Sequence, residues 1–164
     1  MKPITVRALI ALGALLVLGA LNFAIVGKER IKRDGELVYL PLAPVDPRSL
    51  IQGDYMALRF ALARDIERGR EADKRMARDG EVAYAKVALD DKWIARLADA
   101  NAAAAMTLRY RIRDGHVWLG TNAFFFEEGT AERFNGARYG EFRVDRASGE
   151  AVLVGLRNGQ LEAL

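Results

Sequence analysis

The chain has no cysteine and only one histidine among its 164 residues. Without cysteine, a disulfide framework, a thiolate metal site and a cysteine nucleophile are excluded. The histidine, His116, follows the turn signal Asp114-Gly115. We therefore expect it to face solvent in a hairpin rather than to join a catalytic triad or bind a metal. A glycine loop with the spacing needed for phosphate is also missing, so the sequence predicts no cofactor and no metal site.

Charge is missing from one long stretch near the N-terminus. No charged residue lies between Ala8 and Gly27, although charged residues make up 29% of the chain. A helix of about 20 residues is roughly 30 Å long, which matches the hydrocarbon thickness of a bilayer. The run is longer than the apolar part of a usual cleaved signal, and residues 22–27 offer no Ala-x-Ala cleavage pattern. We predict that residues 1–27 are an uncleaved signal anchor with its single transmembrane helix at residues 8–27, in preference to a cleaved signal or a soluble core helix.

Basic residues flank this apolar run on both sides. Lys2 and Arg7 precede it, and residues 28–34 hold four basic and two acidic residues. A basic N-terminus ahead of an apolar run is typical of an exported anchor, and large domains are translocated largely regardless of charge. We expect residues 28–34 to be a basic juxtamembrane segment and residues 35–164 to be an extracytoplasmic domain. That domain has 19 basic and 20 acidic residues, so no nucleic-acid partner is expected.

Turn signals divide the domain at regular intervals. Gly35, Gly80, Gly115, Gly149 and Gly159 each follow Asp, Ser or Asn between apolar segments, a pattern typical of hairpins and short connections. The predicted strands cover residues 36–42, 55–62, 81–89, 93–97, 106–113, 116–119, 139–144 and 150–156. In the 106–113 strand, Leu, Tyr and Ile alternate with Thr and Arg, which indicates a half-buried antiparallel strand.

Two segments suggest peripheral helices. Residues 64–78 are dense in charge and predict an exposed helix, and residues 128–135 predict a short helix with Phe134 turned inward. Three consecutive phenylalanines, residues 124–126, cannot all face one side of a strand, so we expect at least one to be exposed. The predicted fold class is α+β, mainly antiparallel β in a sandwich or partly open barrel, with one or two peripheral helices and a preceding transmembrane helix.

The first candidate site is the loop of residues 46–55. Two prolines hold its start extended, and Asp46 before Pro47 suits the N-cap of a short helical turn. A capped turn leading into a strand explains most of this pattern. A ligand or partner site is the alternative, because four polar or charged side chains converge within a few residues: Asp46, Arg48, Asp54 and Tyr55.

The second candidate site is an alternation of acids and arginines in residues 127–145. In a strand, Tyr139, Glu141 and Arg143 share one face, opposite Phe142 and Val144. Cross-strand pairs of arginine and carboxylate on a solvated face are the simpler interpretation. The alternative is a surface that binds a partner or a small anion. Its candidate residues are Glu127, Glu128, Arg138, Tyr139, Glu141 and Arg143.

Several segments form a recognisable set of motifs. They are Pro44-Val45-Asp46-Pro47-Arg48-Ser49-Leu50 followed by Gly53-Asp54-Tyr55-Met56-Ala57-Leu58-Arg59-Phe60, and residues 122–129, 137–145 and 152–157. With these motifs the chain resembles the GDYxxLxY family of bacterial membrane-anchored proteins. The last motif position is Phe60 instead of tyrosine, which argues against an essential hydroxyl there. The resemblance implies an N-terminal anchor in the bacterial inner membrane, a periplasmic domain and association with polytopic membrane proteins, and it implies no particular reaction.

Together these observations predict a non-enzymatic, single-pass membrane protein. Residues 8–27 would contact the lipid bilayer, and the β-rich domain would bind or stabilise a polytopic membrane protein at the extracytoplasmic face. The alternative is an envelope enzyme or small-ligand-binding protein that uses the 46–55 loop and the 127–145 cluster.

Overall fold

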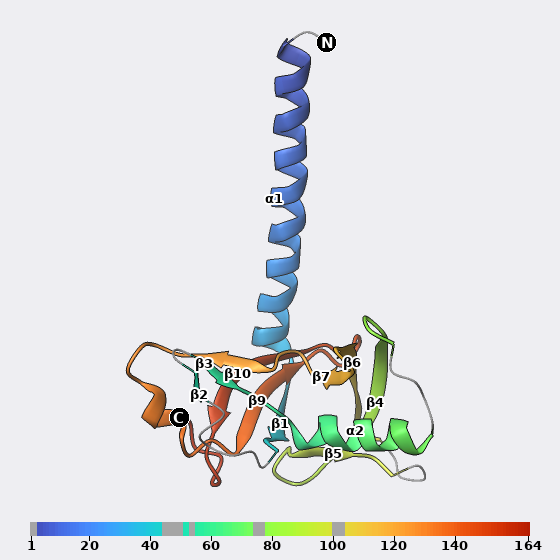
Figure 1. Ribbon diagram of the computed structural model, residues 1–164, viewed down its shortest axis with the longest axis vertical. Coiled ribbons are helices and arrows are strands. Elements are labelled where there is room, and N and C mark those ends of the chain that lie inside the picture. The colour runs from blue at the N-terminus through green and yellow to red at the C-terminus, as the bar shows by residue number, and fades with distance from the viewer. Residues whose placement is uncertain (1–2, 44–50, 53–54, 74–77, 100–103) are drawn as a thin grey trace.

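The computed structural model describes residues 3–43, 51–52, 55–73, 78–99 and 104–164 (Figure 1). A long N-terminal helix, α1 (Pro3–Asp34), stands away from a β-rich domain (Figure 1). Proline is favoured at the first position of a helix because its missing N–H would have no partner there. The side-chain amide of Asn22 donates to the Leu18 carbonyl at 2.9 Å and so has a partner within the apolar run. Within the described residues, α1 is the one helix long and apolar enough to cross a membrane.

Helix α1 leads directly into the first sheet. This sheet holds β1 (Glu36–Pro41), β9 (Tyr139–Val144) and β10 (Ala151–Arg157) in the order β1-β9-β10, with both pairings antiparallel. In the register, Val38 lies opposite Phe142 and Leu40 opposite Gly140. The domain therefore begins with an edge strand that pairs with a strand about a hundred residues later in the chain, so the base of α1 is fixed by the fold of the C-terminal half.

A second sheet and a small third one complete the β structure. The second holds β4 (Val82–Leu89), β5 (Ala95–Leu97), β6 (Met106–Arg113) and β7 (His116–Trp118) in the order β5-β4-β6-β7. The third holds β2 (Ile51–Gln52), β3 (Tyr55–Ala57) and β8 (Ala123–Phe125) in the order β2-β3-β8. The predicted turns at Gly80, Gly115 and Gly149 are confirmed, since their φ angles of 81°, 76° and 69° are ones that favour glycine.

The helices differ in part from the prediction. Helix α2 (Ala61–Ala72) begins three residues before the predicted 64–78 helix, and residues 74–77 of that prediction lie outside the described ones. Consequently the predicted 55–62 strand is wrong at its end: Phe60 is the N-cap of α2. Leu62, Ala63 and Ile66 are buried with helical spacing, and this overrides the alternating pattern before them. The predicted short helix is confirmed as a 3₁₀ turn, Ala131–Phe134, with Phe134 buried.

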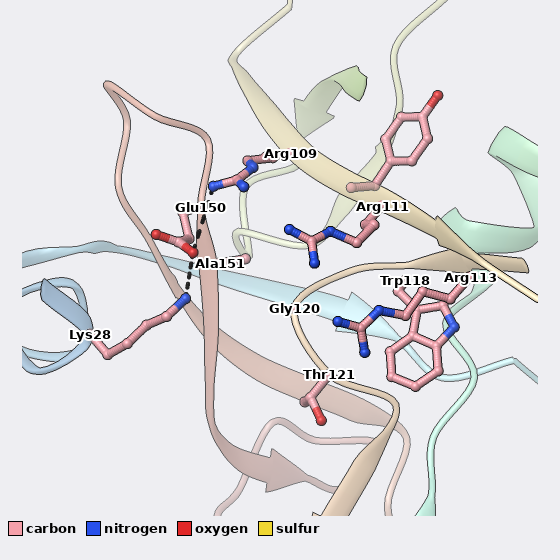
Figure 2. A pocket seen from close by; sticks show the side chains of 10 residues that line it. Lys28, Arg109, Arg111, Arg113, Trp118, Gly120, Thr121, Glu150 and Ala151 are labelled. Atoms are coloured by element: carbon pink, nitrogen blue, oxygen red, sulfur yellow. Dashed lines mark hydrogen bonds and ion pairs between the residues drawn. The ribbon is translucent and has the colours of Figure 1, made fainter. Parts of the chain in front are cut away.

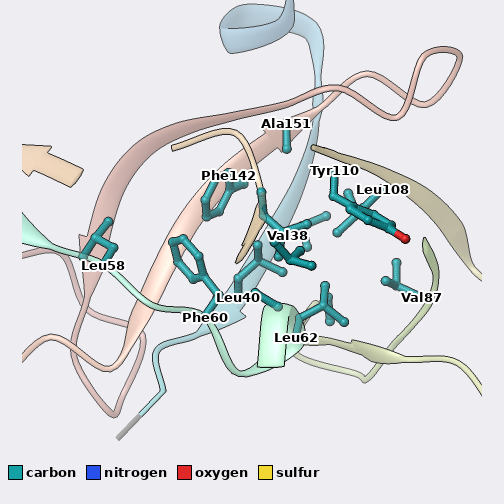
Figure 3. Close-up of a cluster of buried hydrophobic side chains, with 14 of the residues drawn as sticks. Val38, Leu40, Leu58, Phe60, Leu62, Val87, Leu108, Tyr110, Phe142 and Ala151 are labelled. Atoms are coloured by element: carbon teal, nitrogen blue, oxygen red, sulfur yellow. The ribbon is translucent and has the colours of Figure 1, made fainter. Parts of the chain in front are cut away.

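The sheets enclose one hydrophobic core (Figure 3). At its centre the rings of Phe60 and Phe142 meet edge to face with centroids 5.2 Å apart. The second sheet joins the first where the Arg109 N–H donates to the Gly149 carbonyl at 2.7 Å. The α+β class with mainly antiparallel strands in a partly open barrel is confirmed. In Figure 1, α2 and β5 lie at the end of the domain farthest from α1, whereas β6, β7 and β8 lie at the end from which α1 rises.

Candidate functional site

The first candidate loop is only partly described. Asp46, Arg48 and Asp54 lie outside the described residues, so their predicted role stays a prediction. Tyr55 begins β3, opposite Phe125 of β8, and the two rings are 5.7 Å apart between centroids. Phe125 is 74% exposed, which confirms that one of the three consecutive phenylalanines faces outward.

The motif that follows Tyr55 has a structural explanation. Met56, Leu58 and Phe60 alternate inward and are all buried. Phe60 lies against β9 so closely that a Cβ on Gly140 would fall 2.8 Å from its ring. A hydroxyl at this position would be directed into apolar surroundings, so phenylalanine serves the packing. The apolar residues of the motif therefore pack into the core, and they form β3 and the segment that leads into α2.

The second candidate cluster is divided among separate contacts. Glu141 accepts a hydrogen bond from Arg157 Nε at 2.5 Å, and this ion pair raises the pKa of Arg157. Arg143 donates to the Gly35 carbonyl at 3.2 Å, and Arg138 donates to the Ala137 carbonyl at 3.2 Å. Glu141 is buried, so this face of β9 is less solvated than the alternation predicted. The cluster therefore contains the expected cross-strand pair, and its two arginines, Arg138 and Arg143, each donate to a carbonyl of the chain itself.

The remaining predicted residues lie at the surface. Tyr139 is half-buried on β9, while Glu127 and Glu128 are exposed in the segment after β8. Within the described part of the chain, no hydrogen bond or ion pair joins either glutamate to Arg138 or Arg143. In the same part, no three acidic or histidine side chains approach closely enough to hold a metal ion.

The junction between α1 and the domain is a structural feature that the sequence did not reveal. The Gly35 N–H donates to the Ile31 carbonyl at 2.8 Å, and a Cβ on Gly35 would lie 2.4 Å from that oxygen. Ile31 is buried, and Lys28 of α1 forms an ion pair with Glu150 at the start of β10. Asp34-Gly35 forms a short connection, as its pattern predicts, and the glycine also allows the helix end to pack directly against β9.

The comparison with known families identifies the chain. It matches the GDYXXLXY protein family over residues 17–156, which is most of its length. The chain belongs to the GDYXXLXY family. No curated protein and no solved structure matches it. The matched range of this GDYXXLXY chain begins inside α1 and ends in β10. The matched range therefore includes the second half of α1, the junction and most of the domain.

Proposed function

We propose that this GDYXXLXY chain is a single-pass protein of the bacterial inner membrane whose periplasmic domain binds or stabilises a polytopic membrane protein without catalysing a reaction. The observation that carries the proposal is the fixed junction of α1 with the domain. The helix runs unbroken from Pro3 to Asp34, and only Gly35 separates it from the first strand, which begins at Glu36. A domain that binds freely diffusing ligands does not need a rigid connection to its transmembrane helix. A domain that contacts another protein in the same membrane needs a fixed orientation and a fixed distance from the bilayer.

Contacts at the junction support this fixed orientation. Ile31 is buried against the domain, Arg143 donates to the Gly35 carbonyl, and Lys28 pairs with Glu150. Helix α1 contacts both β9 and β10, so its base is held at several points. Tilting the domain relative to the helix would break contacts with both strands.

The surface of α1 supports a partner within the membrane. Its apolar side chains are exposed along the whole described run, including Leu16, Leu21 and Phe23. Gly13 and Gly19 have open space where a Cβ would lie, and Ala20 and Ala24 form a small-xxx-small pair. Small residues let a second transmembrane helix approach closely, which is the main source of helix association in lipid.

In vivo photo-crosslinking tests the proposal. A photoreactive phenylalanine analogue at Phe23, which is 84% exposed on α1, is expected to form an adduct with a polytopic membrane protein. The same analogue at Trp93, an exposed residue in the connection that leads into β5, is the matched control and should form none, because β5 lies at the end of the domain far from α1 (Figure 1). Purification of the chain alone as a monomer, with no adduct from Phe23, would contradict the proposal.

Orientation is tested separately. Fusions of alkaline phosphatase and of green fluorescent protein after Leu164 report on which side of the membrane the C-terminus lies. We expect active phosphatase and no fluorescence. Fluorescent fusion with inactive phosphatase would place the domain in the cytoplasm and overturn the periplasmic assignment.

A further inference from the structure

A row of arginines occupies the outer face of β6. Met106, Leu108, Tyr110 and Ile112 are buried on its inner face, so Arg109, Arg111 and Arg113 point outward together. They line a cleft of about 240 Å³ that Lys28 of α1 and Glu150 also line (Figure 2). Two separate parts of the chain, α1 and β6, thus bring basic side chains to one cleft.

The cleft has more positive charge than its own groups neutralise. Its one carboxylate, Glu150, pairs with Lys28 and lies 3.8 Å from Arg109. Arg111 and Arg113 form no ion pair with any carboxylate in the described part of the chain. The Arg113 guanidinium lies over the Trp118 ring, with Cζ 5.0 Å from the centroid. Stacking on a ring leaves the N–H donors at the guanidinium edge available to an oxyanion.

The cleft lies at a defined height along α1. Lys28 is the first charged residue after the apolar run ends at Gly27. The turn before β10 rises beside the helix, because Ala147 and Glu150 share a groove with Phe23 and Gly27. If α1 spans the bilayer, as the proposed function requires, the cleft opens at the level of the lipid headgroups. Tryptophan is enriched in membrane proteins at that level.

We propose that this cleft binds the phosphodiester headgroup of an anionic phospholipid. Guanidinium groups donate paired hydrogen bonds to phosphate oxygens, and Arg111 and Arg113 supply two such groups without a competing acid. A zwitterionic headgroup carries its own positive charge, so it would be attracted less strongly to the two arginines. The bound headgroup would fix the rotation of the domain about α1 and add to the contacts at the junction.

Tryptophan fluorescence in nanodiscs tests the site on the full chain. The protein has two tryptophans, so Trp93→Phe leaves Trp118 in the cleft as the sole reporter. It is reconstituted in phosphatidylcholine nanodiscs with or without phosphatidylglycerol, together with a trace lipid whose headgroup carries a nitroxide quencher. We expect phosphatidylglycerol to increase quenching of Trp118. About 1 M NaCl should remove the increase, because the Debye length there is about 3 Å.

Matched charge variants locate the effect. An arginine near an anionic surface contributes about fivefold in binding, so Arg111→Gln with Arg113→Gln should weaken the affinity for phosphatidylglycerol, followed by Trp118 quenching, by about twenty-five-fold. Lys92→Gln with Arg96→Gln removes the same charge from the exposed turn and strand at the far end of the domain and should have no effect. Trp118→Phe, which leaves Trp93 as reporter, should show no dependence on phosphatidylglycerol.

Three results would overturn the proposal. The first is equal quenching in both lipid mixtures, and the second is an unchanged response in the Arg111 and Arg113 double variant. The third is a shift of Trp118 emission by inorganic phosphate in phosphatidylcholine nanodiscs as large as that produced by phosphatidylglycerol, because the site would then serve a soluble anion. The experiment contains no partner protein, so its failure is distinct from failure of the partner proposal. Failure of the chain to enter nanodiscs would instead refute the anchor.

Discussion

The junction between α1 and the β1-β9-β10 sheet differs from the outer face of β6 in how its polar groups are matched. At the junction and along β9, Arg143 and Arg157 each have an acceptor inside the domain. On β6, Arg111 has no carboxylate partner within the described part of the chain. The difference indicates that the first region holds the molecule together, while the second is open to an external anion. The number of arginines in a segment of the sequence does not show which of these two roles they have.

Substitution at Gly35 is expected to have the largest effect. A Cβ there would lie 2.4 Å from the Ile31 carbonyl and 3.0 Å from the Val144 nitrogen, and backbone atoms cannot rotate away. We expect Gly35→Ala to lower the free energy of unfolding by about 3 kcal/mol. Gly69→Ala is the matched control, because its position in α2 is open, and it should raise that free energy by about 0.5–1 kcal/mol. Denaturant titration in detergent measures both, and equal effects would contradict the close fit at the junction.

Removing Arg157 should have the next largest effect. Arg157→Ala leaves the buried Glu141 carboxylate without its hydrogen-bond donor, so we expect a loss of about 2 kcal/mol. Arg111→Ala, on the exposed face of β6, should change stability by less than about 0.5 kcal/mol. A comparable loss of stability in both variants would show that the arginines with internal partners and those on the outer face of β6 do not differ in this way. Thermal unfolding monitored by circular dichroism gives the comparison.

Acid should weaken the domain through a third arginine that has an internal partner. Arg70 donates to both Glu81 oxygens, at 3.0 and 2.9 Å, and holds the pKa of Glu81 below its ordinary value. Because the folded pKa is lower than the unfolded one, this stabilisation is present above the ordinary carboxyl pKa of about 4 and is lost as pH falls through the folded value. Glu81→Gln should therefore destabilise the domain at neutral pH and not at strongly acidic pH. A difference that persists in acid would show that the pair does not act through charge.

Lys28 should have the smallest effect on stability. Its ion pair with Glu150 is partly exposed, with 53% and 32% of the two side chains accessible, so Lys28→Gln should cost about 0.5 kcal/mol. Salt should reduce even this difference, because exposed pairs are screened. Thermal midpoints of both proteins at low and high salt measure the effect. A loss as large as that of Arg157→Ala would mean that the ion pair, and not the apolar contact of Ile31, holds the junction.

Local sequence patterns were sufficient to predict much of the fold. Alternation in β6 placed Leu108 and Ile112 inward and Arg109 outward, and Gly115 and Gly149 occupy the predicted turns with positive φ. The error at the end of β3 arose because Leu58, Phe60 and Leu62 fit a strand, whereas Leu62 and Ile66 form the buried face of a helix. The segment contains both the two-residue spacing of a strand and the spacing of a helix, and packing against the core favours the helix.

The junction and the cleft could not be predicted in this way. Lys28 and Glu150 are 122 residues apart in the sequence, and their contact depends on the pairing of β1 with β9 and of β9 with β10. The acid-arginine alternation on β9 predicts cross-strand pairs on a solvated face, with an external site as the alternative. Glu141 does pair with Arg157 on the neighbouring strand, but it is buried, which the alternation does not show. The sequence shows which charges exist, but only tertiary structure shows which of them are neutralised.

A flexible insertion at the junction tests the central claim most directly. About six Gly and Ser residues placed between Asp34 and Gly35 keep the anchor and the domain but end their fixed orientation. We expect the polytopic partner crosslinked from Phe23 to be lost, while the same insertion between Asp91 and Lys92, in the exposed turn between β4 and β5, retains it. Equal recovery of the partner with both insertions would show that the rigid junction between α1 and the domain is not needed for binding.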